Sequence, residues 1–177
     1  MDEMLNKSEE DNKFPKTPVS LGRAYEPKKE NRFLVSFPKE FNIQQWVVAG
    51  CDRPSIDIIE NLDEDSGITS IGDYIINPIT VTFHDPTYPS TTESLMEIFR
   101  SLYERDNIEL YDLLLNGFDF IIELINPTGA VVERWLLTGC KISNIDFGTL
   151  NISSDGGVRC YITIKPKHFE LLNIINN

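Results

Sequence analysis

The segment that decides the fold begins Phe118-Asp119-Phe120-Ile121-Ile122-Glu123-Leu124-Ile125, Asn126-Pro127-Thr128-Gly129, Ala130-Val131-Val132-Glu133-Arg134-Trp135-Leu136-Leu137 and continues to Pro166. Two runs rich in β-branched and aromatic residues, joined by a short Asn/Pro/Gly segment, predict a β-hairpin. A third run, Thr138–Gly148, follows, and a polar turn at Ser154-Asp155-Gly156-Gly157 leads to Val158–Lys165. In this last run Val158, Cys160, Ile162 and Ile164 alternate with polar residues, so they share one face. We therefore expect a four-strand antiparallel meander with one face in a core.

The composition is that of a globular protein with an acidic body. The chain has 177 residues and a net charge of −12, of which about −1 lies in residues 1–31 and −11 in residues 32–177. Binding to nucleic acid by phosphate neutralisation needs clustered Lys and Arg, which this body lacks. No apolar run approaches the roughly 18 residues of a membrane span, and the first residues lack the pattern of a signal peptide.

The chain divides into two regions. Residues 1–31 are rich in Lys, Glu, Asn and Pro, which predicts an extended or flexible N-terminal arm, and residues 32–177 form a β domain. The arm either orders on a neighbouring subunit or stays disordered. Cys51, Cys140 and Cys160 are an odd number of cysteines without CxxC spacing, which favours free thiols, although a Cys140–Cys160 bridge stays open if the meander places them on neighbouring strands.

Two strands are expected at the start of the domain, over Arg32–Pro38 and Asn42–Gly50, with a break at Pro54. A further strand is expected over Asp73–His84, where Pro78 either limits it to an edge or divides it in two.

Residues 56–72 form a long connection with an acidic tip, and we expect a protruding hairpin or loop that contacts another subunit. The expected contact residues are Ile58, Ile59, Leu62, Asp63, Glu64, Asp65, Ile68 and Ile71. The four isoleucines and the one leucine of this set would be unfavourable to expose in a monomer. The acidic spacing matches no calcium loop, so no metal is expected there.

A helix is predicted over about 91–105. Ser90-Thr91-Thr92-Glu93 matches a capping box, and apolar residues follow at helical spacing. Residues 107–117 are ambiguous between helix and strand. The C-terminal residues 168–175 are mildly apolar, and we expect them to dock on a partner.

The sequence offers no catalytic constellation. His84 and His168 have no neighbours at ligand spacing, and there is no GxSxG elbow, phosphate loop or HExxH motif. Asp119 and Glu123 share one face of a predicted strand, but paired acids are common in an acidic protein and are usually solvated. We expect no enzymatic activity, no cofactor and no metal.

Four stretches resemble the tail-tube proteins of contractile-tailed bacteriophages. They are the opening strand Asn31-Arg32-Phe33-Leu34-Val35, the small-residue-to-proline break Ala49-Gly50-Cys51-Asp52-Arg53-Pro54, the strand-to-helix passage Ile79–Asp85, and Glu133-Arg134-Trp135-Leu136-Leu137-Thr138-Gly139-Cys140-Lys141-Ile142. The last of these resembles the hydrophobic, Gly-Cys, then bend signature near the family's C-terminus. The resemblance covers roughly residues 31–167.

The resemblance implies a mainly β fold of two packed antiparallel sheets, a sandwich or barrel, with one flanking helix. It implies hexameric rings stacked into a hollow tail tube through which DNA passes during ejection. The implied partners are further copies of the chain and the tail sheath, baseplate and tape-measure proteins, with no membrane. The implied location is the virion tail, assembled in the host cytoplasm.

Several alternatives stay open. The arm and the tail after Pro166 depart from a plain tube subunit and leave open a specialised role, such as a baseplate ring that initiates the tube. The needle protein of type VI secretion is a related structural alternative. A monomeric β-barrel that binds a small molecule or peptide between sheet and helix is an alternative of a different class, and self-assembly or a pocket of a few hundred cubic ångströms distinguishes it.

Overall fold

The computed structural model describes residues 27–62 and 69–172. For residues 61, 62 and 69–71 it describes the backbone and not the side chains. The strands are β1 (Phe33–Ser36), β2 (Val48–Cys51), β3 (Ile56–Leu62), β4 (Thr69–Ile76), β5 (Ile79–His84), β6 (Phe118–Ile125), β7 (Val131–Asp146), β8 (Arg159–Lys165) and β9 (His168–Leu172). The helices are α1 (Thr91–Tyr103) and α2 (Ile108–Asn116), and two short 3₁₀ turns cover Lys39–Phe41 and Gln45–Val47.

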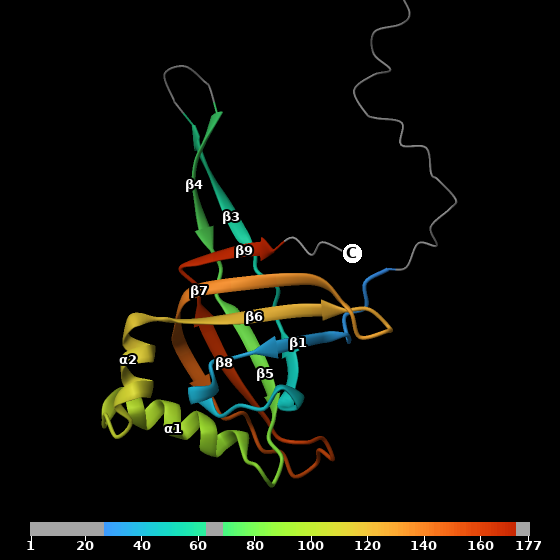
Figure 1. Ribbon diagram of the computed structural model, residues 1–177, viewed down its shortest axis with the longest axis vertical. Helices are drawn as coiled ribbons and strands as arrows, with labels where there is room; N and C mark the ends of the chain where they lie inside the picture. Colours follow the sequence, from blue (N-terminus) through green and yellow to red (C-terminus); the bar gives the residue numbers. More distant parts are fainter. Residues whose placement is uncertain (1–26, 63–68, 173–177) are drawn as a thin grey trace, which may run out of the picture.

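Two antiparallel sheets share β7. Its first part pairs with β6 and β9, and β6 pairs with β1. Its second part pairs with β8, which continues through β5 to β2. Figure 1 shows the strands of the two sheets crossing steeply. The mainly β, two-sheet architecture predicted from the sequence is confirmed, and the arrangement is a sandwich.

The sharing of β7 corrects the predicted four-strand meander. Residues 131–146 form one strand, so the segment 118–166 contains three strands. β7 passes from one sheet to the other at Gly139, whose φ is +61°. A Cβ at this position would lie 3.1 Å from the Cβ of Lys167, so both the conformation and the space favour glycine.

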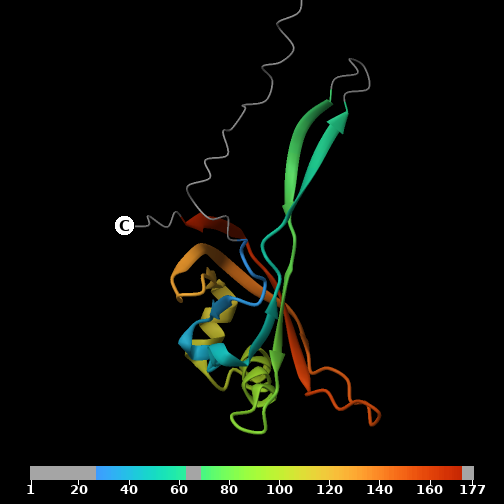
Figure 2. The same ribbon diagram turned by 90° about the vertical axis from the view of Figure 1, so that its right-hand side faces the viewer.

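The core lies between the sheets and the helices. The alternation predicted for the last strand is confirmed, because Cys160, Ile162 and Ile164 are fully buried. From the facing sheet, Phe118, Phe120 and Ile122 point into the same core. Both helices lie on the same side of the β5 and β8 strands (Figure 2).

The predicted helix is confirmed as α1, with the hydroxyl of Ser90 accepting a hydrogen bond from the backbone N–H of Glu93. The prediction of one flanking helix was incomplete, because the ambiguous residues 107–117 form α2. Asn107 caps α2 by accepting from the N–H of Leu110, and Leu110 and Leu114 are buried. Helical burial at i and i+4 therefore decides this segment.

Other boundaries also differ from the predictions. Of the predicted second strand Asn42–Gly50, only residues 48–50 lie in a strand, β2, since Gln45–Val47 is a 3₁₀ turn that buries Val47. Pro78 divides its strand into β4 and β5, which is one of the two outcomes expected. The described part of the C-terminal segment forms β9, which pairs with β7 of the same chain, from Thr138–His168 to Arg134–Leu172. Docking of this segment on a partner stays a prediction.

All three cysteines are free thiols in the structure. The register explains why Cys140 and Cys160 do not meet: Lys141 pairs with Lys165, so Cys140 lies beside one end of β8 and Cys160 lies towards the other. Five residues of strand separate Cys160 from Lys165, roughly 16 Å, whereas a disulfide needs Cα atoms about 4.4–6.8 Å apart. None of the helices in the described ranges is both long and apolar enough to cross a membrane.

Candidate assembly interface

The β3–β4 hairpin is the feature that the rest of the fold does not use. Within the described chain the two strands pair only with each other. They project from one end of the molecule, away from both sheets (Figures 1 and 2). An isolated two-stranded hairpin is marginally stable in water unless it packs against something. The hairpin is therefore the first candidate for a contact with another chain.

Both faces of the hairpin carry exposed apolar side chains. Residues that pair directly lie on the same face, so Ile58 and Tyr74 form one face with Ile56. These three side chains are 59%, 55% and 46% exposed. The opposite face pairs Asp57 with Ile75 and Ile59 with Asp73. One face is thus apolar and the other combines two isoleucines with two carboxylates.

The pairing changes register in the middle of the hairpin. Ile59 pairs with Asp73 and Glu60 pairs with Ile71, which leaves Gly72 as an extra residue in β4. An extra residue of this kind strengthens the twist of the two strands. The twist re-aims the outer half of the hairpin relative to its base.

Backbone contacts tie the base of the hairpin to the body. Asp52 N–H donates to the carbonyl of Thr80 at 3.0 Å, and Thr80 N–H donates to the Asp52 carboxylate at 3.0 Å. Asn77 N–H donates to the carbonyl of Ser55, also at 3.0 Å. The hairpin thus leaves the sheet from a fixed position.

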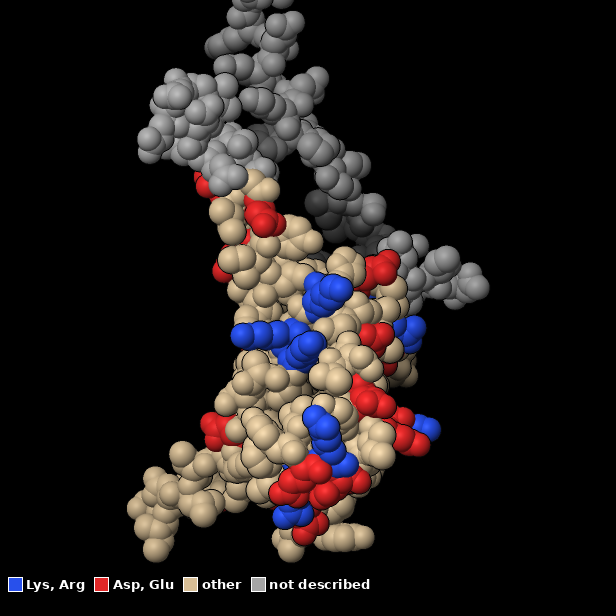
Figure 3. All heavy atoms as spheres, turned by 90° about the vertical axis from the view of Figure 1, so that its left-hand side faces the viewer, with Lys and Arg blue, Asp and Glu red and all other residues tan. Residues whose placement is uncertain are grey.

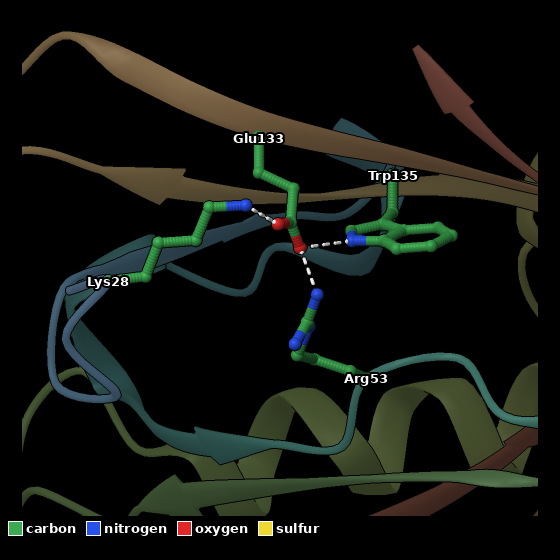
Figure 4. Close-up of polar contacts among 4 residues, drawn as sticks. All are labelled: Lys28, Arg53, Glu133 and Trp135. Atoms are coloured by element: carbon green, nitrogen blue, oxygen red, sulfur yellow. Dashed lines mark hydrogen bonds and ion pairs between the residues drawn. The ribbon is translucent and has the colours of Figure 1, made fainter. Parts of the chain in front are cut away.

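A buried carboxylate adds a further anchor at this base (Figure 4). The side chain of Glu133, on β7, is only 4% exposed. Its oxygens accept from Lys28, from Arg53 at 2.5 Å and from the indole N–H of Trp135 at 2.6 Å. Arg53 also lies over the Trp135 ring, 5.9 Å from its centroid. Glu133 therefore joins the segment before β1, the segment before β3, and β7.

The ionised form of Glu133 is the one that these contacts stabilise. Burial acts to raise the pKa of Glu133, but hydrogen bonds from Lys28 and Trp135 and the positive charge of Arg53 outweigh burial and hold the pKa below the usual range. A charged group buried with several donors stabilises a fold only while it stays ionised.

The predicted contact residues can now be placed. Ile58 and Ile59 are exposed, on opposite faces of β3. Leu62 and Ile71 belong to β3 and β4, but their side chains are not described, and Asp63, Glu64, Asp65 and Ile68 lie outside the described residues. Sequence reasoning missed Tyr74 and Ile75, because it placed Asp73–Ile76 in the following strand, and it left Ile56 out of the contact set although Ile56 lies within residues 56–72. The Asn77-Pro78 pair was the signal that separates them.

Among the described residues, the hollow between the helices and the sheet is smaller than a typical ligand site. The cavity at the helix–sheet boundary, lined by Leu102, Leu114, Leu115, Lys141 and Ile142, measures about 210 Å³. Ligand pockets are generally about 300 to 1,000 Å³ and contain several converging polar groups. A larger hollow of about 580 Å³ lies beside β1 and residues 49–53, and is bordered by Lys28 and Lys29.

The residues weighed for metal binding or catalysis do not assemble into a site. His84 ends β5 and His168 begins β9, and among the described residues no group of three or more His, Cys, Asp or Glu is placed to hold a metal. The Asp119 carboxylate accepts from the N–H of Gly139, and Glu123 pairs with Arg134 at 2.6 Å. Both acids therefore have structural partners.

Solved structures show which proteins share this fold. A chain of the anti-feeding prophage cap, described as a tube-terminating cap, has a TM-score of 0.64 and 15% identity over 86% of this chain and 95% of that one. A chain of the sheath/tube terminator of the extracellular contractile injection system PVC also has a TM-score of 0.64, with 15% identity over 85% of this chain and 100% of its own. A chain of the PVC sheath–tube complex has a TM-score of 0.61 and 16% identity over 84% and 93% of the two chains.

Neither a family model nor a curated sequence matches the chain, so only the structural comparison gives similar proteins. At 15–16% identity the structural similarity establishes a common architecture over most of both chains. It agrees with the architecture that the sequence resemblance implied. The chain shares its fold with chains from these tube-terminating cap, sheath/tube terminator and sheath–tube structures.

Proposed function

We propose that the protein is a structural subunit of a contractile-tail tube, and that six copies form a ring and rings stack into a hollow tube. The observation that carries the proposal is the β3–β4 hairpin, which has exposed apolar residues on both faces and whose two strands pair only with each other within the described chain. Exposing these apolar side chains to water costs free energy in a monomer, and burying them between copies of the chain removes that cost.

The opposite end of the molecule supports head-to-tail stacking. The connection between β7 and β8, residues 147–158, lies at the end of the long axis away from the hairpin (Figure 1). It exposes Leu150 and Ile152, at 85% and 104%. Different apolar surfaces at opposite ends suit heterologous contacts, which generate rings or stacks and not closed dimers.

The finer parts of the proposal are the six-fold ring, the passage of DNA through the lumen, and the tail sheath, baseplate and tape-measure proteins as partners. The net charge of −12 supports DNA passage, because an acidic wall repels phosphate groups. The proposed location is the tail of a phage or phage-like particle. The proposal also covers a ring that initiates or terminates the tube, since such a ring uses the same fold at another position along the tail.

The proposal is tested by shortening the hairpin. Deleting residues 58–71 joins Asp57 to Gly72, and because Asp57 pairs with Ile75 the remaining residues 72–74 can close a short turn. No residue of β3 or β4 is among the described core residues, so the variant is expected to fold. Negative-stain electron microscopy should show rings or tubes for the full chain and monomers for the deletion.

Two results would count against the proposal. Unchanged tubes from a folded deletion variant would remove the hairpin from the interface. A full-length chain that stays monomeric alone and with added tail partners would favour the ligand-binding alternative. A chain that adds only to the ends of preformed tubes would place it in an initiating or terminating ring.

A further inference from the structure

Three lysines gather where β7 leaves one sheet for the other. Lys141 pairs directly with Lys165 of β8, so their side chains lie on the same face. Lys167 lies beside Gly139, two residues before Lys141, with its Cβ 3.1 Å from the position of a Cβ at Gly139. All three lysines are exposed. We refer to Lys141, Lys165 and Lys167 as the lysine cluster.

The lysine cluster has no acidic partner within the described residues. None of the ion pairs found there involves Lys141, Lys165 or Lys167. One carboxylate, Asp119, lies nearby, and its Oδ1 accepts from the N–H of Gly139 at 2.9 Å. In a chain of net charge −12, Lys141 and Lys165 on one face, with Lys167 beside Gly139, form a local positive surface.

An apolar hollow adjoins the cluster. Lys141 borders the cavity of about 210 Å³ between α1, α2 and β7. The other lining residues are aliphatic, and Leu115 is 54% exposed. The surface thus combines positive charge with an apolar recess, which is the pattern of a contact that needs both an anion and an apolar side chain.

The hairpin carries the complementary chemistry. Residues 56–76 contain six acidic residues and no Lys or Arg. On one face the carboxylates of Asp57 and Asp73 flank Ile59 and Ile75, which are 38% and 53% exposed. Neither carboxylate has an ion-pair partner in the described part of the chain.

The hairpin makes no ion pair with the lysine cluster of its own chain among the described residues. It projects away from the body, while the cluster lies on the bend of β7 (Figure 2). Figure 3, which faces the side where β7 bends, shows basic side chains near the middle of the body and acidic ones on the hairpin above them.

We infer that the lysine cluster and its adjoining hollow are the docking surface for the Asp57–Asp73 face of the hairpin of a second copy of this chain. The carboxylates face the lysines, and an isoleucine of the same face enters the hollow. This inference rests on the proposed tube assembly and specifies which surface of the neighbour receives the hairpin.

Charge reversal on each side tests the inference. One variant carries Lys141→Glu and Lys165→Glu, and the other carries Asp57→Lys and Asp73→Lys. Each alone opposes like charges, so the concentration needed for assembly should rise by about tenfold or more. Mixed in equal amounts, the two variants should assemble again, because each hairpin then meets a surface of opposite charge.

Controls separate charge from folding and from net-charge effects. The pair Lys39→Glu and Arg100→Glu makes the same change in net charge as the pair Lys141→Glu and Lys165→Glu, at exposed positions elsewhere, and should leave assembly unchanged. Circular dichroism and thermal unfolding check that each variant is folded. Sedimentation and electron microscopy give the assembled fraction.

The outcomes distinguish this inference from the proposed function. If the wild-type chain assembles and either charge-reversed variant assembles equally well, the docking surface is wrong and the tube proposal stands. Failure of the folded variants to assemble when mixed also overturns the docking surface. A wild-type chain that never assembles overturns the tube proposal and this inference with it. Loss by each variant and recovery on mixing supports the inference.

Discussion

The guanidinium of Arg53 donates a hydrogen bond of 2.5 Å to the carboxylate of Glu133, across 80 positions of sequence. Arg53 immediately precedes the Pro54-Ser55 segment that leads into β3, whereas Glu133 lies on β7. This contact joins the base of the hairpin to the strand shared by both sheets. The direction in which the hairpin leaves the body is therefore fixed by a contact with the folded core.

Replacing Glu133 by Gln should lower the free energy of unfolding by about 1–3 kcal/mol, because a buried charged acceptor with three donors is lost. Urea denaturation measures the change. Glu123→Gln is the matched control, since Glu123 pairs with Arg134 on the neighbouring strand but its side chain is 15% exposed against 4% for Glu133. The control should cost less than about 1 kcal/mol. Equal losses for the two variants would contradict the role assigned to Glu133.

The stability contributed by Glu133 should depend on pH. Its pKa in the folded protein lies below the ordinary value of 4.5, so the unfolded chain takes up the proton first as the pH falls. The contribution is therefore fully present above about pH 4.5 and disappears as the pH falls through the pKa of the folded state. The measurement is the difference in unfolding free energy between wild type and Glu133→Gln at a series of pH values. A difference that grows on acidification would be inconsistent with this sign.

Asp85 should be more important to the start of α1 than the predicted cap Ser90. Its Oδ1 accepts from the N–H groups of Thr91 and Thr92 at 2.8 and 3.1 Å, and its Oδ2 accepts from the Thr92 hydroxyl at 2.6 Å. Asp85→Ala should therefore cost about 1–2 kcal/mol of unfolding free energy, by loss of the cap and of a negative charge at the helix N-terminus. Chemical denaturation of Asp85→Ala and Ser90→Ala compares them, and a larger loss for Ser90→Ala would refute the ranking.

The apolar face of the hairpin should matter for assembly and not for the fold of the subunit. Changing Ile58 and Tyr74 together to Ser should alter the unfolding free energy by less than about 0.5 kcal/mol, since both side chains are exposed. The same change should abolish rings or tubes. Tyr88→Ser, at a side chain that is 88% exposed outside the hairpin, serves as the control. Sedimentation of the wild type, the double variant and the control measures assembly. Assembly by the double variant would show that the Ile58–Tyr74 face is not part of the interface.

The thiols of the native protein should be unreactive. Burial, with the nearby charge of Asp119, raises the pKa of Cys140 to about 12, and burial with Asp52 does the same for Cys51. Because the thiolate is the reactive form, titration with an aromatic disulfide near pH 8 should be slow until the chain is unfolded. Rapid reaction of Cys140 in the folded protein would show that the β7 bend opens.

Several parts of the fold follow from local sequence patterns. The alternation through Cys160, Ile162 and Ile164 predicts the buried face of β8, and Ser90 with the apolar spacing after it predicts α1. The protruding connection at 56–72 is also predictable, because its isoleucines have no place in the expected core. These features depend on neighbours within a few positions, which is where periodicity and capping rules apply.

The features that sequence reasoning missed depend on long-range contacts. No residue close to Gly139 in the sequence indicates that β7 continues through Gly139 into a second sheet, because the need for glycine there depends on the contact with Lys167. The contact of Arg53 with Glu133 and the pairing of β9 with β7 likewise join residues far apart in sequence. For the same reason the lysine cluster becomes visible only when β7 and β8 are placed in register.

The most direct test of the central claim is electron microscopy of the purified full-length chain, with light scattering on the same sample. Six-fold rings or hollow tubes are the predicted result, and they should disappear when residues 58–71 are deleted. A monodisperse monomer that binds none of the added tail components would contradict the claim that this protein is a tube subunit.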